Sequence, residues 1–379
     1  MSKKLWIPTL IIAVIIVGLV IFVPRSKNLT DKEIIKIGVL ADLSGDYSNL
    51  FKGAPRGVEL AVENLRKETG KNIVVIIEDQ KSCDTKEVIS AINKLINIDQ
   101  VDFVVGGTCS NTTLAAAPIA ESSKTIMISA MSSAPSITKA GDYIFRTYIS
   151  DTARGTKLAK LIFEKLNKKK LALITDISND GYVETQNTLK ETFKDLGGEI
   201  VLDETTDRGG VDFKTILSKV KETNPDVISV GLGLTSGIAL FKQKEEMGLE
   251  TLVVSPFETL EDSNFLKIVG QIAEGSLIYV MPGNPPESPL YQELQNEYQT
   301  KYNEAIAQYV AESYDATMLG VKAVLKSNRT KEDIKDKLYS VSKDYRGVSG
   351  NTVFDVNGDV TKEVLFKTIK NGQFVRYEE

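Results

Sequence analysis

The sequence predicts an α/β protein with two doubly wound parallel-sheet lobes, preceded by an N-terminal transmembrane helix. Two observations predict the lobes: short β-rich apolar runs alternate with longer amphipathic runs, and this alternation starts again after Asp151. The membrane helix is predicted by the 19 residues from Leu5 to Val23, which contain no charge. With 379 residues, 42% hydrophobic and 26% charged, the chain has the composition of an ordinary globular protein of about two units.

The uncharged segment from Leu5 to Val23 is long enough to span a bilayer, because 19 helical residues extend about 28 Å. Lys3 and Lys4 precede it, so the positive-inside rule places everything after Arg25 outside the cytoplasm. A cleaved signal peptide is the alternative, although residues 21–24 are poor cleavage-site residues. We therefore expect residues 1–33 to be an uncleaved membrane anchor and spacer that tethers an extracytoplasmic protein, or a signal segment of a secreted or periplasmic one.

The first alternating series begins at Ile34. Its apolar runs predict strands at residues 34–40, 72–78, 102–107 and 125–129, and its amphipathic runs predict helices at residues 53–68, 85–98 and 110–123. The second series predicts strands at residues 171–176, 199–203, 226–231 and 251–255, and helices at residues 156–166, 182–196, 213–223 and 236–247. Ligands of such sheets bind at the carboxyl ends of the strands, so two facing units predict a cleft.

The order of elements changes after Ser276. A strand at residues 276–280 and a Pro-rich break are followed by predicted helices at residues 291–302, 310–327 and 330–341. The turn dipeptide Asn357-Gly358 predicts a final hairpin between residues 354–356 and a strand at residues 364–369. The surrounding run DVNGD lacks the distal glutamate of a calcium loop, which favours a plain turn.

The composition excludes several kinds of reactive site. The chain has no histidine, so it cannot build a Ser-His-Asp site or a His-ligated metal centre, and two cysteines are too few for a thiolate zinc site. Beyond residue 33 there are 41 basic and 49 acidic residues, which argues against a nucleic-acid partner. Carboxylate or lysine chemistry remains possible, as does a protein that only binds. We expect no cofactor and no metal.

Cys83 and Cys109 follow the second and third predicted strands. Neighbouring parallel strands end side by side, so a disulfide is plausible outside the cell, and two unpaired buried thiols are the alternative. Ser110 and Asn111 open the next predicted helix, where backbone N–H groups and hydroxyls suit an anion, although a simple N-cap is also possible.

Two further serines, Ser132 and Ser133, follow the next strand. Two hydroxyl-rich strand ends side by side could hold one small anion from two directions. In the second unit, polar side chains also follow strands, namely Asp176, Asp180, Tyr182 and Glu258, and these either face the cleft or are solvated loop residues. The run from Gly231 to Gly237 departs from a dinucleotide-binding motif by one residue.

Taken in order, these motifs resemble a known family. The sequence resembles the type I periplasmic substrate-binding proteins of ABC transporters, in the leucine/isoleucine/valine-binding branch, from about Ile34 to Val375. The resemblance is carried by IKIGVLADLSG, by Cys83-Asp84 with GTCSNTT, by ISAMSSAPSIT, by FRTY, by AEGSLIYVMPG, by Tyr314-Asp315-Ala316 and by FDVNGD. It implies that Cys83 and Cys109 form the family's disulfide, that Ser110 and Ser133 bind a ligand α-carboxylate, and that the Met131 carbonyl receives its ammonium.

The likeness is weaker in the second lobe. At two positions where the family has a tyrosine, this sequence has Asp180, with Tyr182 nearby, and Gly233. At the position where the family has the acid that binds the ligand ammonium, this sequence has Phe257. The resemblance therefore implies that either the adjacent Glu258 or Asp180 takes that role.

The resemblance also implies an architecture and a function. It implies a Venus flytrap with three crossings between its lobes, with lobe one at residues 34–150 and 280–345 and lobe two at residues 151–279 and 346–379. The implied function is a receptor, not an enzyme, that binds an amino acid or related ligand and delivers it to an ABC permease. A ligand-sensing domain with a separate signalling partner is the alternative. An enzyme would need a closely placed pair of acids, and the sequence offers only isolated candidates.

Overall fold

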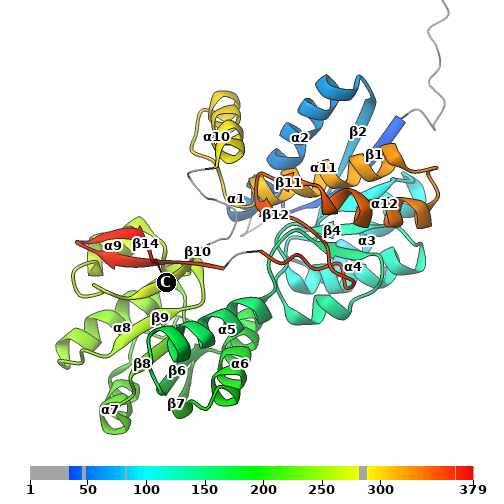
Figure 1. Cartoon of the computed structure of the whole chain (residues 1–379). Coiled ribbons are helices and arrows are strands. Elements are labelled where there is room, and N and C mark those ends of the chain that lie inside the picture. The colour runs from blue at the N-terminus through cyan, green and yellow to red at the C-terminus, as the bar shows by residue number, and fades with distance from the viewer. Residues whose placement is uncertain are drawn as a thin grey trace, which may run out of the picture.

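The computed structural model describes residues 34–44, 48–81, 83–207, 209–280, 288–362 and 364–378. Figure 1 shows two lobes, one formed by the blue, cyan and orange segments and the other by the green, yellow-green and red segments. The predicted transmembrane helix lies outside the described residues. Within the described ranges, none of the helices combines the length and the apolar character needed to cross a bilayer.

The first lobe is built on a five-stranded parallel sheet with the order β2-β1-β3-β4-β5. Its strands are β1 (Ile34–Ala41), β2 (Asn72–Asp79), β3 (Phe103–Val105), β4 (Met127–Ser129) and β5 (Ile144–Arg146). The helices of this part of the chain are α1 (Ser48–Phe51), α2 (Gly53–Thr69), α3 (Thr85–Asn93) with the π-helical turn η2 (Lys94–Ile98), α4 (Ser110–Ser122) and the 3₁₀ turn η3 (Pro135–Lys139). Three later helices complete the lobe: α10 (Pro289–Tyr302), α11 (Val310–Lys326) and α12 (Lys331–Lys343).

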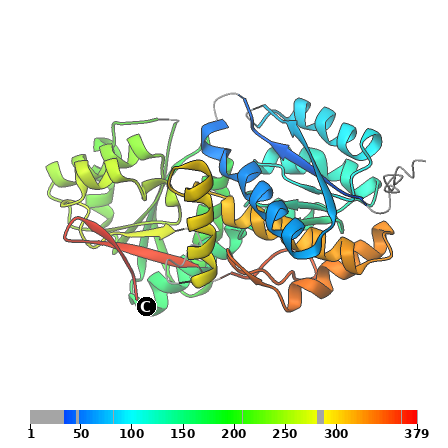
Figure 2. The same ribbon diagram turned by 90° about the horizontal axis from the view of Figure 1, so that it is seen from above.

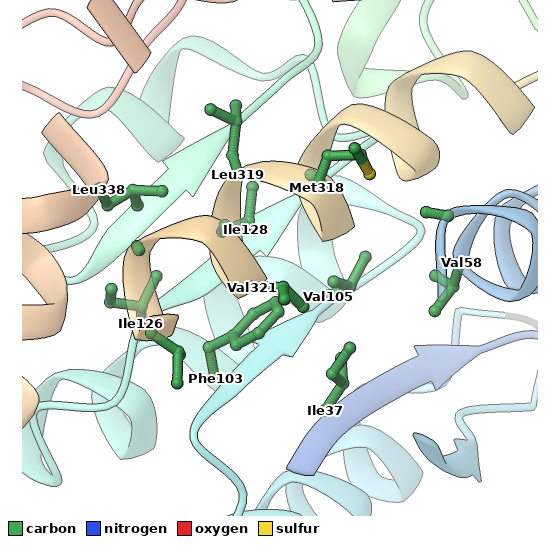
Figure 3. Close-up of a cluster of buried hydrophobic side chains, with 14 of the residues drawn as sticks. Ile37, Val58, Phe103, Val105, Ile126, Ile128, Met318, Leu319, Val321 and Leu338 are labelled. Atoms are coloured by element: carbon green, nitrogen blue, oxygen red, sulfur yellow. The ribbon is translucent and has the colours of Figure 1, made fainter. Parts of the chain in front are cut away.

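Alternation along β1 divides the apolar residues of the first lobe between two cores. Ile37 points toward α2, α11 and α12, whereas Leu40 joins the opposite core with α3 and α4. In Figure 3, side chains of α11 such as Met318 and Leu319 lie among those of the strands, including Ile128. The late helix α11 therefore covers the sheet built by the first third of the chain.

The second lobe contains a seven-stranded sheet with the order β14-β13-β10-β9-β8-β6-β7. Its strands are β6 (Lys170–Asp176), β7 (Glu199–Thr206), β8 (Val227–Gly231), β9 (Leu252–Ser255), β10 (Leu277–Val280), β13 (Leu365–Lys370) and β14 (Gln373–Arg376). Its helices are α5 (Asp151–Lys160) with the π-helical turn η4 (Leu161–Lys165), α6 (Asp180–Asp195), α7 (Lys214–Thr223), α8 (Leu234–Glu246), the 3₁₀ turn η5 (Glu258–Leu260) and α9 (Ser263–Val269). Separate apolar cores on the two faces confirm the predicted doubly wound arrangement.

The predicted final hairpin is wrong in its pairing. Gly358 does form a turn, with a φ of 77° and an N–H that donates to the Asp355 carbonyl at 3.1 Å. That turn closes only one bridge, between Phe354 and Val360. Strand β13 instead pairs antiparallel with β10 on one side and with β14 on the other. A second Asn-Gly turn, at residues 371–372, joins β13 to β14. The second turn forms the longer hairpin because β13 also pairs with β10 and so joins the sheet.

The chain passes between the lobes after β5, after β10 and near residues 361–364. The last passage lies later than the predicted boundary at residue 346, because Phe354 and Val360 pack in the core of the first lobe, whereas Val364 and Phe366 pack in that of the second. The short strands β11 (Arg346–Gly347) and β12 (Gly350–Asn351) precede this passage. We therefore propose that the second lobe resumes after Val360. Figure 2, which views the molecule from above, shows the red strands on the side of the green and yellow-green segments of the second lobe and away from the orange helices.

An ion pair fixes the third passage to the end of β5. Arg146 is fully buried, and its guanidinium makes two contacts with the Asp359 carboxylate, at 2.6 and 2.8 Å. It also donates to the Thr138 hydroxyl at 2.7 Å and to the Ala134 carbonyl at 2.9 Å. The first and third passages therefore leave the first lobe at neighbouring points.

Candidate functional site

A disulfide joins the loops after β2 and β3, as predicted. Cys83 and Cys109 are bonded, with 5.6 Å between their Cα atoms. The buried carboxylate of Asp42 accepts hydrogen bonds from the Cys83 N–H at 3.1 Å, from Gln80 at 3.3 Å and from the Thr108 hydroxyl. These contacts fix both loops at the carboxyl edge of the sheet, where α4 begins.

The N-terminus of α4 is connected to the loops on either side. The Ser110 hydroxyl accepts a hydrogen bond from the Ala134 N–H at 3.2 Å, and the exposed Asn111 donates to the Cys83 carbonyl at 3.0 Å. Ser110 is half-buried at the first turn of the helix, where the helix dipole favours an anion. The structure thus brings Ser110 next to the loop that carries the other predicted serines.

The two predicted serines after β4 differ in their surroundings. Ser132 is buried, and its hydroxyl lies 2.7 Å from the Thr113 hydroxyl and 3.3 Å from the Gly107 carbonyl. Ser133 is half-buried, and its backbone carbonyl accepts a hydrogen bond from the Asp151 N–H at 2.8 Å. Ser132 therefore supports the loop from inside, whereas Ser133 joins that loop to the first passage between the lobes.

A buried apolar cluster lies beside these serines. Met131 is buried among Phe51, Ala54 and Ala130, and the two cysteines and Tyr309 pack against this cluster. The Phe51 and Tyr309 rings lie 5.6 Å apart, and the Tyr309 ring lies 5.9 Å from that of Tyr148 on the first passage. Burial raises the pKa of Tyr309, so its hydroxyl stays protonated at neutral pH.

Arg154 on α5 connects the first passage to the second lobe. Its side chain is only 4% exposed and donates to the Tyr148 hydroxyl at 3.0 Å and to the Glu258 carboxylate at 3.3 Å. A further ion pair joins it to Asp151 at 3.4 Å, and its guanidinium lies 5.3 Å from the ring centre of Tyr148 and 5.9 Å from that of Phe257. The Tyr148 hydroxyl also donates to Glu258 at 3.2 Å.

The predicted residues of the second lobe separate into an interior group and a group at the passage. Tyr182 is buried, its ring lies 4.5 Å from that of Phe257, and burial raises its pKa to about 12. Glu258, next to the buried Phe257, reaches Arg154 and Tyr148. Asp180 begins α6, and its side chain lies outside the described part of the structure. Of the two candidate acids, Glu258 is therefore the one with described contacts at the first passage, and the choice between Glu258 and Asp180 stays a prediction.

Glu312 is a buried carboxylate in the first turn of α11, three residues after Tyr309. It is 1% exposed, and among the described residues neither of its carboxylate oxygens has a hydrogen-bond partner. Burial raises the pKa of Glu312 to about 7, the charge of Lys362 opposes this rise, and the charges of Asp315 and Glu258 reinforce it. Its backbone carbonyl accepts a hydrogen bond from the Thr147 hydroxyl at 2.9 Å, which places it beside the first passage.

Stability should therefore depend on pH through Glu312. The folded protein keeps this proton up to about pH 7, whereas the unfolded chain loses it near its ordinary pKa of 4.5, so the contribution is complete below about pH 4.5 and is lost as the pH rises through about 7. We expect the free energy of unfolding to lose about 2 to 3 kcal/mol over this range relative to Glu312→Gln. Urea unfolding of both proteins at pH 4.5 and 7.5 measures this difference, and equal pH dependence would contradict it.

A pocket of about 970 Å³ lies elsewhere at the junction of the lobes. It is lined by residues of η3 and α5, by Ser150, Asp355 and Val364 and by residues 359–362, and none of the predicted site residues borders it. Asp42, Cys83 and Cys109 come within 4.8 Å of one another, but the disulfide uses both sulfurs and leaves one carboxylate, so these residues do not fit a metal ion.

Sequence reasoning missed the residues that join the predicted site residues: Phe51, Tyr148, Arg154, Tyr309 and Glu312. The spacing of Asp151 and Arg154 at the start of a helix, directly after FRTY, is the one local signal that could have indicated a buried charged pair.

The sequence matches a family model described as periplasmic binding protein over residues 34–373. It is 28% identical over 351 residues to the leucine-, isoleucine-, valine-, threonine- and alanine-binding protein of Pseudomonas aeruginosa, covering 91% of this chain and 89% of that protein. It is 26% identical to the Leu/Ile/Val-binding protein of Escherichia coli K12, covering 88% of this chain and 90% of that protein.

Solved structures agree with these relatives. The branched-chain amino acid transporter substrate-binding protein of Streptococcus pneumoniae, in complex with isoleucine, superposes with a TM-score of 0.74 at 29% identity and covers 91% of this chain and 100% of that one. The leucine-binding protein of Thermotoga maritima has the same fold, with a TM-score of 0.74 at 24% identity, and covers 91% of this chain and 98% of that one. The match to the family model over residues 34–373, together with the two α/β lobes, shows that the chain belongs to the periplasmic binding protein family.

Proposed function

We propose that this protein is the extracytoplasmic solute-binding receptor of an ABC importer and that it binds a branched-chain or similar amino acid between two lobes that close on it. One observation carries the proposal: the Ser133 carbonyl is hydrogen-bonded to the Asp151 N–H, so the loop that carries the serine proposed to bind an anion adjoins a cluster of acids around Arg154. An α-amino acid carries its carboxylate and its ammonium on one carbon. Its binding site therefore needs hydrogen-bond donors for the carboxylate next to acids for the ammonium.

The first lobe supplies the carboxylate end of the proposed site. The hydroxyls of Ser110 and Ser133 and the N-terminus of α4 offer hydrogen bonds to a carboxylate, each contributing roughly 1.5 to 3 kcal/mol. Met131, Phe51 and Tyr309 supply an apolar surface next to these groups, which suits an aliphatic side chain. The relatives named above are described as binding leucine, isoleucine and valine, and this supports the same ligand class here.

In the proposed site, the second lobe supplies the acid that binds the ligand ammonium. Glu258 lies against Tyr148 and Arg154, and we propose that it receives the ligand ammonium, with Tyr182 in the same wall and Asp180 as the other candidate acid. The carbonyl of Met131 would accept from the ammonium on the opposite side. The family relationship supports a receptor rather than an enzyme, and the partners we propose are the membrane subunits of an ABC permease.

Isothermal titration of the purified full-length chain with leucine, isoleucine, valine and alanine tests the proposal. We expect binding of at least one of them, and we expect Ser110→Ala or Ser133→Ala to weaken it about 10- to 100-fold, because each change removes one hydrogen bond to a charged group. Ser136→Ala is the matched control, since this exposed serine lies three residues after Ser133, in the adjoining turn η3. If no amino acid binds, or if the control weakens binding as much as Ser133→Ala does, the proposed site is wrong.

We also propose that residues 1–33 tether the receptor to the membrane by the uncharged segment from Leu5 to Val23. The positive charges before the segment and the absence of small cleavage-site residues after it support this. Mass spectrometry of the protein from its membrane fraction should find the N-terminal peptide intact. A mature N-terminus near Ser26 would show a cleaved signal peptide instead.

A further inference from the structure

The pocket at the junction of the lobes is bounded by both lobes and by the chain that joins them. It has a volume of about 970 Å³ and is lined by residues of η3 in the first lobe, of α5 in the second lobe and of the third passage. Ligand pockets in proteins commonly measure about 300 to 1,000 Å³, so a small organic molecule fits this space. None of the residues proposed to bind an amino acid lines it.

Apolar side chains from both lobes line this pocket. Val360 is 6% exposed and belongs to a core of the first lobe, whereas Val364 is 7% exposed and belongs to a core of the second. Ala153 on α5 packs against that core of the second lobe, and Pro135 lines the pocket from η3. An apolar group that covers these side chains would remove their remaining surface from water, which favours binding.

Two exposed lysines from different lobes line the same pocket. Lys139 is the last residue of η3 and Lys160 is the last residue of α5. Among the residues that the structure describes, neither of these two lysines has an ion-pair partner. Lys157 and the buried Lys362 also line the pocket, but Lys362 donates to the Ser349 hydroxyl at 2.6 Å and Lys157 has another partner. Lys139 and Lys160 are therefore the lysines available to an anion.

The acids that line the pocket already accept hydrogen bonds within the fold. The Asp359 carboxylate is held at two points by the buried Arg146 guanidinium and accepts from the Thr138 hydroxyl at 2.7 Å. The Asp355 carboxylate accepts from the backbone N–H groups of residues 357 and 359, at 2.8 and 3.0 Å. Among the described lining residues, the two exposed lysines are thus less compensated than the acids, which favours an anionic ligand group over a cationic one.

We propose that this pocket is a second ligand site, which binds a small apolar molecule with one anionic group, such as an aromatic sulfonate or carboxylate. The apolar part lies against Ala153, Val360 and Val364, and the ammonium groups of Lys139 and Lys160 attract the anionic group. Such a molecule contacts both lobes, so it stabilises the relative position of the lobes in which the pocket has this shape. The site shares no residue with the proposed amino acid site.

Calorimetry with two probes of the same skeleton tests this site. Naphthalene-1-sulfonate carries one negative charge, whereas naphthalene-1-sulfonamide is uncharged. Each probe is titrated into the full-length chain, and the heat of titration into the same buffer and detergent without protein is subtracted. We expect saturable binding of the sulfonate, with a smaller Kd than that of the sulfonamide, because only the sulfonate is attracted by both lysines.

Variants of the lysines and of the apolar lining separate the two parts of the site. The double variant Lys139→Gln/Lys160→Gln should raise the Kd of the sulfonate about 3- to 10-fold, because each exposed charge contributes modestly, and should change that of the sulfonamide less than about two-fold. Ala153→Phe places a ring in the pocket and should raise both Kd values at least about ten-fold, because the probe and the new ring compete for the same space.

Lys165→Gln is the matched control for charge. This exposed lysine lies on the π-helical turn that continues α5 but does not line the pocket, so its loss should change both Kd values less than about two-fold. If Ala153→Phe does not fold, Thr361→Phe, at an exposed position of the third passage, blocks the pocket instead.

Three results would overturn the inference: no saturable binding of the sulfonate by the wild-type chain, an unchanged Kd in the variant that blocks the pocket, or a loss of affinity in Lys165→Gln equal to that in the double lysine variant. Leucine binding is measured in a separate titration. Its absence would contradict the proposed function and leave this second site unaffected.

Discussion

Replacing Asp315 by alanine should lower the free energy of unfolding by about 3 to 5 kcal/mol, because it leaves a buried charge and several buried donors without their acceptor. Asp315 on α11 is fully buried and accepts hydrogen bonds from the Tyr345 hydroxyl at 2.7 Å, the Val348 N–H at 3.0 Å and the Ser349 N–H at 2.8 Å. The Ser349 hydroxyl also donates to it.

Asp315 compensates the positive charge of Lys362. This buried lysine donates to the Ser349 hydroxyl at 2.6 Å, and burial lowers its pKa while the charges of Glu312 and Asp315 oppose that shift. Without Asp315, Lys362 at the third passage would lose one of the two α11 acids that stabilise its charge. Urea unfolding at pH 7.5 measures the loss in stability.

Two further variants serve as comparisons for Asp315→Ala. Asp315→Asn keeps the side-chain shape and should cost less than the alanine variant, because an amide oxygen still accepts hydrogen bonds. Asp195→Ala, at an exposed helix end, should change stability by less than about 0.5 kcal/mol. A loss of under about 1 kcal/mol in Asp315→Ala would contradict the role of this network in joining α11 to the third passage.

Removing the disulfide with the paired variant Cys83→Ser/Cys109→Ser should lower the free energy of unfolding by about 3 to 4 kcal/mol in the chain-entropy model. The bridged residues are 26 positions apart, so the bond restricts a loop of that length in the unfolded chain. Wild-type protein unfolded in dithiothreitol should match the variant, and oxidised wild type should not. Equal unfolding midpoints for the variant and the oxidised protein would show that the bond does not stabilise the fold.

Most of the fold could be predicted because its elements are encoded locally. The apolar run of β1, for example, places Ile37 and Leu40 on opposite faces, and each face meets its own set of helices. The start of α5 was predicted five residues late, at Thr156, because its first turn is polar; Ser150 caps that turn by accepting from the Thr152 N–H. The pairing of β13 was not predicted because two Asn-Gly turns compete within fifteen residues, and only tertiary contacts select between them.

The candidate site was predictable in its first lobe and much less so in its second. Ser110 and Ser133 lie shortly after the ends of the neighbouring strands β3 and β4, so the parallel sheet alone brings their loops together. Arg154 meets Glu258 across 104 residues, and a charged side chain near a helix start otherwise indicates a solvated position. Glu312 is buried because α11 is enclosed by the first lobe and the passages, which no local pattern expresses.

The composition of the first lobe's core has a consequence for the order of folding. This core contains Ile35, at the start of the described chain, and Val360, close to its end, so it cannot be completed until nearly the whole polypeptide is available. The strands β6 to β10 of the second lobe, in contrast, are contiguous between Lys170 and Val280. As the chain emerges from N-terminus to C-terminus, the inner strands of the second lobe can therefore pair while the N-terminal lobe still waits for α11 and α12, and both lobes need the C-terminal segment, with Val360 in one core and Phe366 in the other, to complete their cores.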